Sequence, residues 1–317
     1  MRVAPPGDPF GPARHIDGRF VNHSGHARER GEVWRWYRTR DPKVWPRNIS
    51  NGPVARPVAR VTHGIRATVI GHATVLLQVA GLNIVTDPHW SDRAGPASWL
   101  GAKRRCPPAI AFDDLPPVDL VLLSHSHYDH LDRPTLAALH RRDRPRLLTG
   151  LKVGAIVPQG DVAEMDWWQR QPVRDDIAVT YVPAEHASAR TPFDRNRTLW
   201  GGFVIETPAG TIYFAGDTGD GDHFTAIRGR FGPIALSFLP IGAYAPRWFM
   251  AAVHLDPEQA VTAAATLQSR VTLPIHYGVF NLADDGYDEP LRLLRAALAA
   301  HPGLDFRVPA FGEAVQL

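Results

Sequence analysis

The sequence contains very little cysteine and lysine and no long apolar run. Each of these features excludes certain classes of protein or kinds of site. Cys106 is the only cysteine among 317 residues, so an intrachain disulfide and a thiolate zinc knuckle are both excluded. No run reaches the roughly 20 apolar residues of a membrane-spanning helix. Lysine occurs only three times, the formal net charge is +3, and no basic block carries interleaved aromatics, so nucleic-acid binding is not expected. Any metal ion must therefore be held by histidine and carboxylate.

The first 60 residues differ in composition from the rest of the chain. They are rich in proline, arginine and histidine, and we interpret residues 1–60 as an arm packed on a main domain of residues 61–317. A short helix is expected near residues 29–38, with Trp34 and Tyr37 on one side; a partly disordered tail is the alternative. The N-terminal residues lack the apolar stretch of a secretory signal, so the expected location is cytoplasmic.

The main domain contains two similar β-rich halves. Residues 73–88 predict a hairpin with Gly81 at its turn, and residues 201–218 predict another with Gly210 at its turn. Each hairpin ends at an aspartate, Asp87 or Asp217, and each is followed by a further apolar strand and a helix. The natural architecture is α+β, a four-layer αββα sandwich of two mixed β-sheets with outer helices. Both aspartates would then lie at one rim of the sandwich.

One segment after a buried strand concentrates side chains that bind metals. The segment SHSHYDHLD contains His125, His127, Asp129 and His130 in the spacing H-x-H-x-D-H. On extended backbone His125 and His127 point the same way and can share one ion, while Asp129 and His130 follow the turn and can face a second ion. Zinc accepts imidazole and carboxylate ligands, and hydrolytic sites leave a position for water. A single metal ion would not need so many ligands.

Further donors are expected where other apolar strands end. Three polar residues meet this condition, namely His186, Asp217 and His276. A carboxylate can bridge two ions, and Asp217 is the best candidate for that position. Other histidines, His23, His89 and His223 among them, we interpret as surface or loop residues.

These motifs resemble the metallo-β-lactamase-fold hydrolases, whose signature is H-x-H-x-D-H. The resemblance is closer to the branch that contains N-acylphosphatidylethanolamine-hydrolysing phospholipase D, and it covers roughly residues 65–280. The stretches that carry it include GHATVLL, TDPHWSDRAGP, YFAGDTG, RFGPIALSFLPIGAYAPRWFM, HLDPEQAV and PIHYGVF. It implies the αββα sandwich, a hydrolase domain over residues 61–317 and a dinuclear zinc site.

The resemblance also implies a division of the ligands between two zinc ions. One ion would be held by His125, His127 and His186, the other by Asp129, His130 and His276, with Asp217 bridging. Iron or manganese would suit the same donors. His254, which directly precedes a predicted helix N-terminus, matches a family histidine beside the site. The chain departs from the family pattern at Ala187, Ala189 and Ala245, which leaves the exact substrate open.

The expected reaction is hydrolysis of a phosphodiester in N-acylphosphatidylethanolamine-like lipids. A hydroxide between the two ions would attack phosphorus, with Asp129 and Asp217 holding the ions and His254 binding the phosphoryl oxygens or donating a proton. Asp87 and His72 would lie behind the ligands and order the histidine-rich loop; a turn role is the alternative for each. One rival function is a lactonase or other ester or amide hydrolase on the same fold, and another is a non-catalytic metal sensor.

A lipid substrate needs an apolar entrance near the metal ions. We expect Tyr244, Trp248 and Phe249 to contribute substrate-binding side chains, with core packing as the alternative role. The expected partners are a phospholipid or another small ester substrate. Peripheral contact with the inner face of the membrane and a homodimer are left open.

Overall fold

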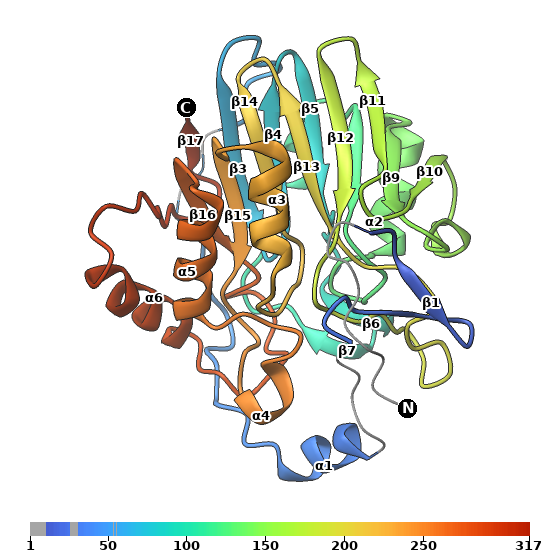
Figure 1. Ribbon diagram of the computed structural model, residues 1–317, viewed down its shortest axis with the longest axis vertical. Helices are drawn as coiled ribbons and strands as arrows, with labels where there is room; N and C mark the ends of the chain where they lie inside the picture. The colour runs from blue at the N-terminus through green and yellow to red at the C-terminus, as the bar shows by residue number, and fades with distance from the viewer. Residues whose placement is uncertain (1–10, 26–30, 53, 55) are drawn as a thin grey trace.

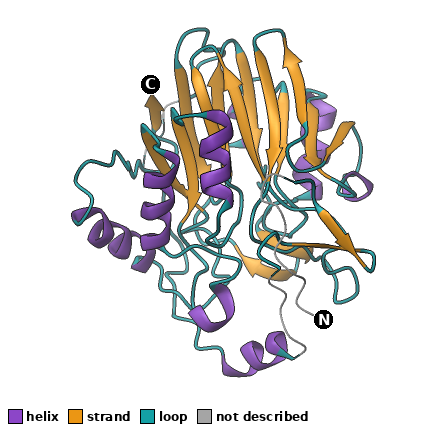
Figure 2. Cartoon of the chain, in the orientation of Figure 1, coloured by secondary structure: helices purple, strands orange, loops and turns teal. Residues whose placement is uncertain are grey.

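The computed structural model describes residues 11–25, 31–52, 54 and 56–317 of the chain (Figure 1). The stretch that argued against a secretory signal therefore falls largely outside the described residues, as does the start expected for the first helix. From Ile65 to the C-terminus the chain forms two large β-sheets with helices outside them (Figure 2). This arrangement confirms the predicted αββα sandwich.

The first sheet has seven strands in the order β10-β9-β8-β5-β4-β3-β17. The hairpin predicted around Gly81 is β4 paired antiparallel with β5, and β5 then pairs in parallel with β8. The sheet is therefore mixed. Its strands are β3 (Ile65–Gly71), β4 (Thr74–Val79), β5 (Leu82–Thr86), β8 (Leu120–Leu123), β9 (Arg146–Gly150), β10 (Asp161–Met165) and β17 (Ala314–Gln316).

The second sheet has six strands in the order β11-β12-β13-β14-β15-β16. The second predicted hairpin is β13 paired antiparallel with β14, and β14 then pairs in parallel with β15, so the two halves repeat one pattern. The strands are β11 (Arg170–Arg174), β12 (Ile177–Val182), β13 (Gly202–Thr207), β14 (Gly210–Phe214), β15 (Leu236–Pro240) and β16 (Val271–Ile275).

Alternation along the strands divides the apolar residues between two layers. In β8, Leu120 and Leu122 belong to the main core between the sheets, whereas Val121 and Leu123 face the opposite way. On that outer face Leu136 of α2 packs over the first sheet. Successive strand residues point to opposite faces, so a strand covered on both faces is apolar throughout. This explains why every residue of β8 is apolar, up to the polar segment that follows the strand.

The helices cover the outer faces of the sandwich. Helix α5 contacts β15 of the second sheet and also packs against α3 and α6. The predicted capping box is present, because the Asp256 side chain accepts from the Gln259 backbone N–H and Gln259 accepts from the Asp256 N–H. The longer helices are α2 (Arg133–Arg142), α3 (His223–Phe231), α5 (Pro257–Leu267) and α6 (Glu289–Ala299); shorter turns are α4 (Arg247–Met250), η1 (Phe112–Asp114) and η2 (Gly154–Ile156).

The described part of the arm contains two short strands and one helix, and two of its tryptophans pack on the main domain. Strands β1 (Arg14–Ile16) and β2 (Arg19–Val21) pair with each other, and α1 (Glu32–Thr39) lies beside α4 in Figure 1. Trp45 is buried and donates to the Asp285 carbonyl, while Trp36 stacks on Phe249. Trp34 is different: it is 65% exposed and stacks only on its neighbour Tyr37. Two of the three tryptophans thus attach the arm, and the third remains at the surface.

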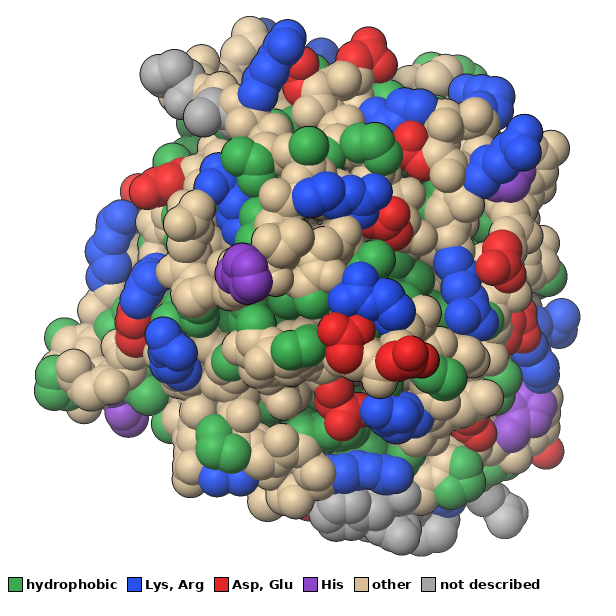
Figure 3. All heavy atoms as spheres, turned by 90° about the horizontal axis from the view of Figure 1, so that it is seen from above, with side chains coloured by type: hydrophobic (Ala, Val, Ile, Leu, Met, Phe, Trp, Pro, Cys, Tyr) green, Lys and Arg blue, Asp and Glu red, His purple; other side chains and the backbone are tan. Residues whose placement is uncertain are grey.

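The two ends of the strands differ in character. Figure 3, seen from above, shows the end formed by the hairpin tips, where basic and acidic side chains are interspersed. Ion pairs such as Arg174–Asp176 and Arg170–Glu206 occur there. Strands β6 (Arg93–Ala97) and β7 (Leu100–Lys103) form a small separate sheet toward the other end. Among the described residues, no helix has the length and apolar character needed to span a bilayer.

Candidate metal centre

The predicted metal donors meet at the rim of the sandwich opposite the hairpin tips. His125, His127, Asp129 and His130 follow β8 of the first sheet. The second sheet contributes one residue after each of three strands: His186 after β12, Asp217 after β14 and His276 after β16. Within this cluster, groups of three or four potential ligand atoms lie within 4.8 Å of one another. The structure therefore brings together every residue that the sequence predicts as a ligand, and their binding of metal stays a prediction.

One group consists of three histidines from both sheets. His125 Nε2 lies 2.8 Å from His127 Nδ1, and that nitrogen lies 3.2 Å from His186 Nε2. His125 and His186 are fully buried, while His127 is partly exposed. This is the predicted grouping for one ion, with His127 using a different ring nitrogen from its two neighbours.

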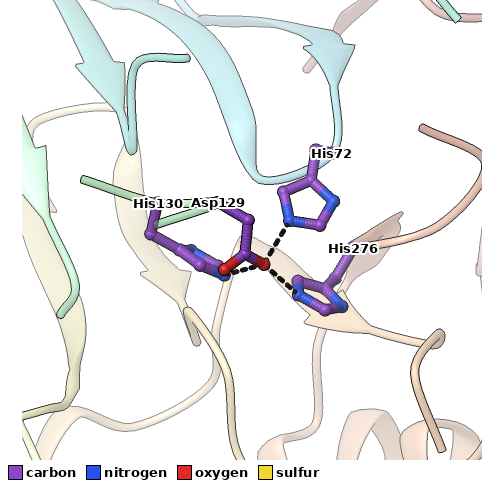
Figure 4. Close-up of side chains that lie close together, drawn as sticks. All are labelled: His72, Asp129, His130 and His276. Atoms are coloured by element: carbon purple, nitrogen blue, oxygen red, sulfur yellow. Dashed lines mark hydrogen bonds and ion pairs between the residues drawn. The ribbon is translucent and has the colours of Figure 1, made fainter. Parts of the chain in front are cut away.

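The other group surrounds the carboxylate of Asp129 (Figure 4). Asp129 Oδ2 lies 3.2 Å from Nε2 of both His130 and His276. His72 joins this group, because its Nε2 lies 2.8 Å from the same oxygen. His72 occupies the turn between β3 and β4 with a positive φ of 57°, and its carbonyl accepts from the His276 N–H. His72 thus lies among the donors rather than behind the histidine-rich loop.

Asp217 lies between the two groups. Its Oδ2 is 3.1 Å from Nε2 of both His130 and His276. The same oxygen is 3.7 Å from His186 Nε2 and 4.0 Å from His125 Nε2. One carboxylate oxygen within reach of both sets of histidines is the geometry that bridging two ions requires.

Asp87 supports both groups from behind. Its carboxylate accepts from His130 Nδ1 at 2.7 Å and from Ser124 Oγ at 2.6 Å. Ser124 Oγ is in turn 2.9 Å from His125 Nδ1 and can accept its proton. These bonds fix the tautomers so that Nε2 of His125 and of His130 faces the cluster. Asp87 thus lies behind His125 and His130, and its role in ordering metal ligands stays a prediction.

The pKa values of His125 and His186 shift in the opposite direction to that of His276. Burial holds the pKa of His125 and His186 well below the usual value, so these imidazoles are neutral. Burial acts in the same sense on His276, but the Asp217 and Asp129 carboxylates outweigh it and raise its pKa to about 9. Burial alone would raise the pKa of Asp217, yet His130 and His276 hold it well below its usual range. The Asp217 carboxylate is therefore ionised, and a cation beside it would be stabilised.

The potential ligand atoms are arranged to bind a divalent metal ion rather than to hydrogen-bond to one another. The far nitrogens of His125 and His186 face Ser124 Oγ and the Val253 carbonyl, so both Nε2 atoms present lone pairs to His127 Nδ1. That nitrogen can hold only one proton. Asp217 Oδ1 is buried and accepts no hydrogen bond from any described residue. A cation would take up these lone pairs, and imidazole with carboxylate suits zinc, iron and manganese alike.

His254 lies at the edge of the cluster. Its ring centroid is 5.1 Å from that of His186 and 5.3 Å from that of His276, and it is only partly buried. Together with His186 and Asp217 it forms a further group of potential ligand atoms. His254 therefore lies beside the cluster, and its contact with substrate stays a prediction.

The aromatic side chains that the sequence predicts to bind substrate do not gather around the cluster as the potential metal ligands do. A pocket of about 400 Å³ opens over the cluster, with His127, Tyr128, Asp129, Ala189, Asn281 and Leu282 among its lining residues. Trp248 lines a separate pocket at the surface, and Tyr244 is buried. Phe249 is also buried, in a small apolar cluster that includes Leu282. Their contact with substrate stays a prediction, and Leu282 links Phe249 to the pocket.

Three histidines that we interpreted as surface or loop residues are buried. His23 lies against the ring of Trp167, and His223 is the first residue of α3. His89 accepts from Arg104 Nη2 at 2.9 Å. The interpretation is wrong for His23, which is not at the surface, and for His223, which is in a helix and not in a loop. His89 does lie in a loop, the one after β5, although it is buried there. Local sequence does not reveal the packing that buries these rings, such as that of Trp167 on His23.

Comparison with known proteins agrees with this geometry. The model of the beta-lactamase superfamily domain matches residues 82–277. An uncharacterized protein of Mycobacterium tuberculosis is 42% identical over 254 residues, covering 77% of this chain and 67% of its own length. The N-acyl-phosphatidylethanolamine-hydrolyzing phospholipase D 1 of Caenorhabditis elegans is 36% identical over 256 residues, covering 76% of this chain and 72% of its own length.

A solved structure shows the same fold at lower identity. The metallo hydrolase of the archaeon Ignicoccus hospitalis superposes with a TM-score of 0.62 at 23% identity, covering 80% of this chain and 99% of its own. The fold and the histidine–aspartate cluster thus define a metal-dependent hydrolase of the metallo-β-lactamase fold. The chain belongs to the beta-lactamase superfamily.

Proposed function

We propose that this protein is a dinuclear zinc phosphodiesterase of phospholipase D type, which acts on N-acylphosphatidylethanolamine-like lipids. The observation that carries the proposal is Asp217 Oδ2, which lies within 4.0 Å of the facing nitrogens of His125, His130, His186 and His276. The similarity to the Caenorhabditis elegans phospholipase D supports the choice of substrate.

The residues of the chain have distinct tasks in this proposal. His125, His127 and His186 would hold one ion, and Asp129, His130 and His276 the other, with Asp217 between them. Two bound divalent ions supply a water nucleophile at neutral pH and stabilise negative charge on the phosphoryl oxygens. Asp87 keeps His130 oriented, and the Val253 carbonyl does the same for His186 at 2.8 Å. His254 is placed to hydrogen-bond a phosphoryl oxygen or to protonate the leaving alcohol.

A second candidate is a lactonase or other ester or amide hydrolase that uses the same metal ions. The pocket over the cluster favours it in one respect, because three of its lining residues, Ala94, Ala102 and Ala189, have small side chains that leave room for a compact ester. A small, compact ester would fill about 400 Å³, whereas a phospholipid must extend beyond the pocket.

The deciding experiment presents both substrate classes to the zinc-loaded protein. Vesicles containing N-acylphosphatidylethanolamine are incubated with the protein, and the products are identified by mass. We expect a phosphatidic acid and an N-acylethanolamine. Cleavage of lactones without cleavage of the lipid would support the second candidate, and turnover of neither substrate would favour a metal sensor.

We further propose that α1 brings this site to a lipid surface. Val33, Trp34 and Tyr37 of α1 are exposed, as is Trp248 of α4, and the guanidinium of Arg35 lies 4.6 Å from the centroid of the Trp248 ring. Exposed aromatics beside arginine suit the interface of an anionic bilayer. The double variant W34S/Y37S should sediment less with anionic vesicles, while hydrolysis of a water-soluble phosphodiester stays unchanged. Equal sedimentation of variant and wild type would contradict this surface.

A further inference from the structure

Among the described residues of the arm, Asn22, which follows β2, bonds directly to a residue of the metal centre. Asn22 is 4% exposed and lies 164 positions from His186 in the sequence. Its Nδ2 donates to the His186 carbonyl at 3.0 Å, and its Oδ1 accepts from the His186 N–H at 3.1 Å. The same oxygen accepts from Trp200 Nε1 at 3.0 Å. One side-chain amide therefore pairs with both backbone polar groups of a predicted metal ligand.

His186 needs such a partner because of its place in the chain. It lies in the long connection between β12 and β13, where no neighbouring strand can bond its backbone. His276, by contrast, directly follows the last residue of β16, and its N–H donates to the carbonyl of His72. A buried backbone group without a hydrogen-bond partner is unfavourable, so we expect the His186 peptide groups to shift when Asn22 is removed.

Neighbouring residues of the arm reinforce the contact. Ser24 donates to the Glu185 carboxylate through both its backbone N–H and its hydroxyl. Phe20 donates to the Asn196 carbonyl at 2.8 Å, and His23 packs on Trp167. The arm thus contacts the loop that contains His186 on both sides of that residue.

We propose that Asn22 is a positioning residue for His186, and that the arm thereby governs metal loading in the half of the centre formed by His125, His127 and His186. The hydrogen bonds that hold the other half, with Asp129, His130 and His276, come from Asp87 and His72 of the main domain, so we expect this half to be less sensitive to the loss of Asn22. The proposal rests on the metal centre of the proposed function but not on its lipid substrate.

The test is a titration of the metal-free full chain with Co²⁺, followed by its visible absorption and by the bound metal per chain. Wild-type protein should take up two ions tightly. Asn22→Ala should keep one tight site and weaken the other by about 10- to 100-fold, the usual effect of losing a residue that orients a ligand. Asn22→Asp should give an intermediate loss, because a carboxylate still accepts from the His186 N–H but cannot donate to its carbonyl.

Asn83 provides a matched control. It is another fully buried asparagine whose Nδ2 donates to backbone carbonyls, those of Ala59 and Pro117, but it lies at the start of β5, away from the cluster. Asn83→Ala should unfold at lower urea concentration and still bind two ions with wild-type affinity.

The outcomes separate this proposal from the proposed function. Two tight sites in Asn22→Ala, or an equal weakening of both, would overturn the positioning role. The same would follow if Asn83→Ala lost one site in the same way. A wild-type protein that binds no cobalt would overturn the metal centre itself. Neither result depends on which substrate the protein hydrolyses.

Discussion

Asp87 and Asp217 occupy equivalent places in the two halves of the chain, yet their surroundings differ. Each follows the second strand of a hairpin, and each is buried. The Asp87 carboxylate is satisfied by its own half, accepting from Ser124 N–H, Ser124 Oγ and His130 Nδ1. Asp217 faces histidines of both halves, and its Oδ1 accepts no hydrogen bond from the described residues. A saturated carboxylate supports ligands, whereas an unsaturated one is free to bind a cation.

The first prediction removes the charge of the unsaturated aspartate. Asp217→Asn keeps the size of the side chain but cannot bridge two cations as a carboxylate does. Metal ions contribute several kcal/mol to such reactions, so hydrolysis of bis(p-nitrophenyl) phosphate should fall by about a thousandfold or more. Bound zinc, measured by elemental analysis, should fall below two ions per chain. A variant with full zinc content and activity would contradict the bridging role.

The same substitution at Asp87 should have a smaller effect. Asp87→Asn leaves the ligands in place but loses the charged acceptor for His130 Nδ1 and Ser124 Oγ. Zinc affinity should fall by about 10- to 100-fold, and added zinc should restore activity. Competition with a chromophoric chelator measures the affinity. The comparison fails if Asp87→Asn proves as damaging as Asp217→Asn under saturating zinc.

The local part of this site was predictable from the sequence. The spacing H-x-H-x-D-H places four donors on one segment after β8, and Asp217 and His276 each end an apolar run, so strand topology brings them to the same rim. The hairpins at Gly81 and Gly210 and the capping box at Asp256 were predictable for the same reason, because each depends on residues near in sequence.

Contacts between distant segments were not predictable. Asn22 gives no local signal, since its role depends on an arm that returns to His186. The proximity of His72 to Asp129 depends on how one tight turn faces the loop after β8. Which tryptophans of the arm are buried also depends on how α1 lies on the main domain, because the helix turns Trp34 outward while Trp36 stacks on Phe249.

The two halves also share a buried neutral histidine near each aspartate. Burial lowers the pKa of His89 to about 4 and that of His223 to about 3. Arg104 donates to His89 Nδ1, which further disfavours its protonation, and His223 Nε2 lies 3.1 Å from Thr218 Oγ1. Both rings therefore stay neutral in the folded protein at pH values where the unfolded chain binds protons.

This difference predicts a loss of stability in acid. The contribution of each histidine is fully present above about pH 6.5 and is lost as the pH falls toward 4, at about 1.4 kcal/mol per pH unit for each proton. Urea unfolding of the metal-free protein at several pH values measures this slope. His223→Gln should reduce the slope by roughly one proton, and an unchanged slope would show that His223 is not neutral in the folded state.

The smallest effect is expected at the aspartates that precede α2 and α5. Asp256 caps α5 through the Gln259 N–H, whereas Asp132 does not cap α2 and instead accepts from Ser91 N–H, Ser91 Oγ and Thr135 Oγ1. Asp256→Ala should lower the free energy of unfolding by about 1 kcal/mol and leave zinc affinity unchanged. Asp132→Ala should lower zinc affinity as well, because it releases the loop after Asp87 and lies two residues from His130. Equal zinc affinities in the two variants would contradict this difference between the halves.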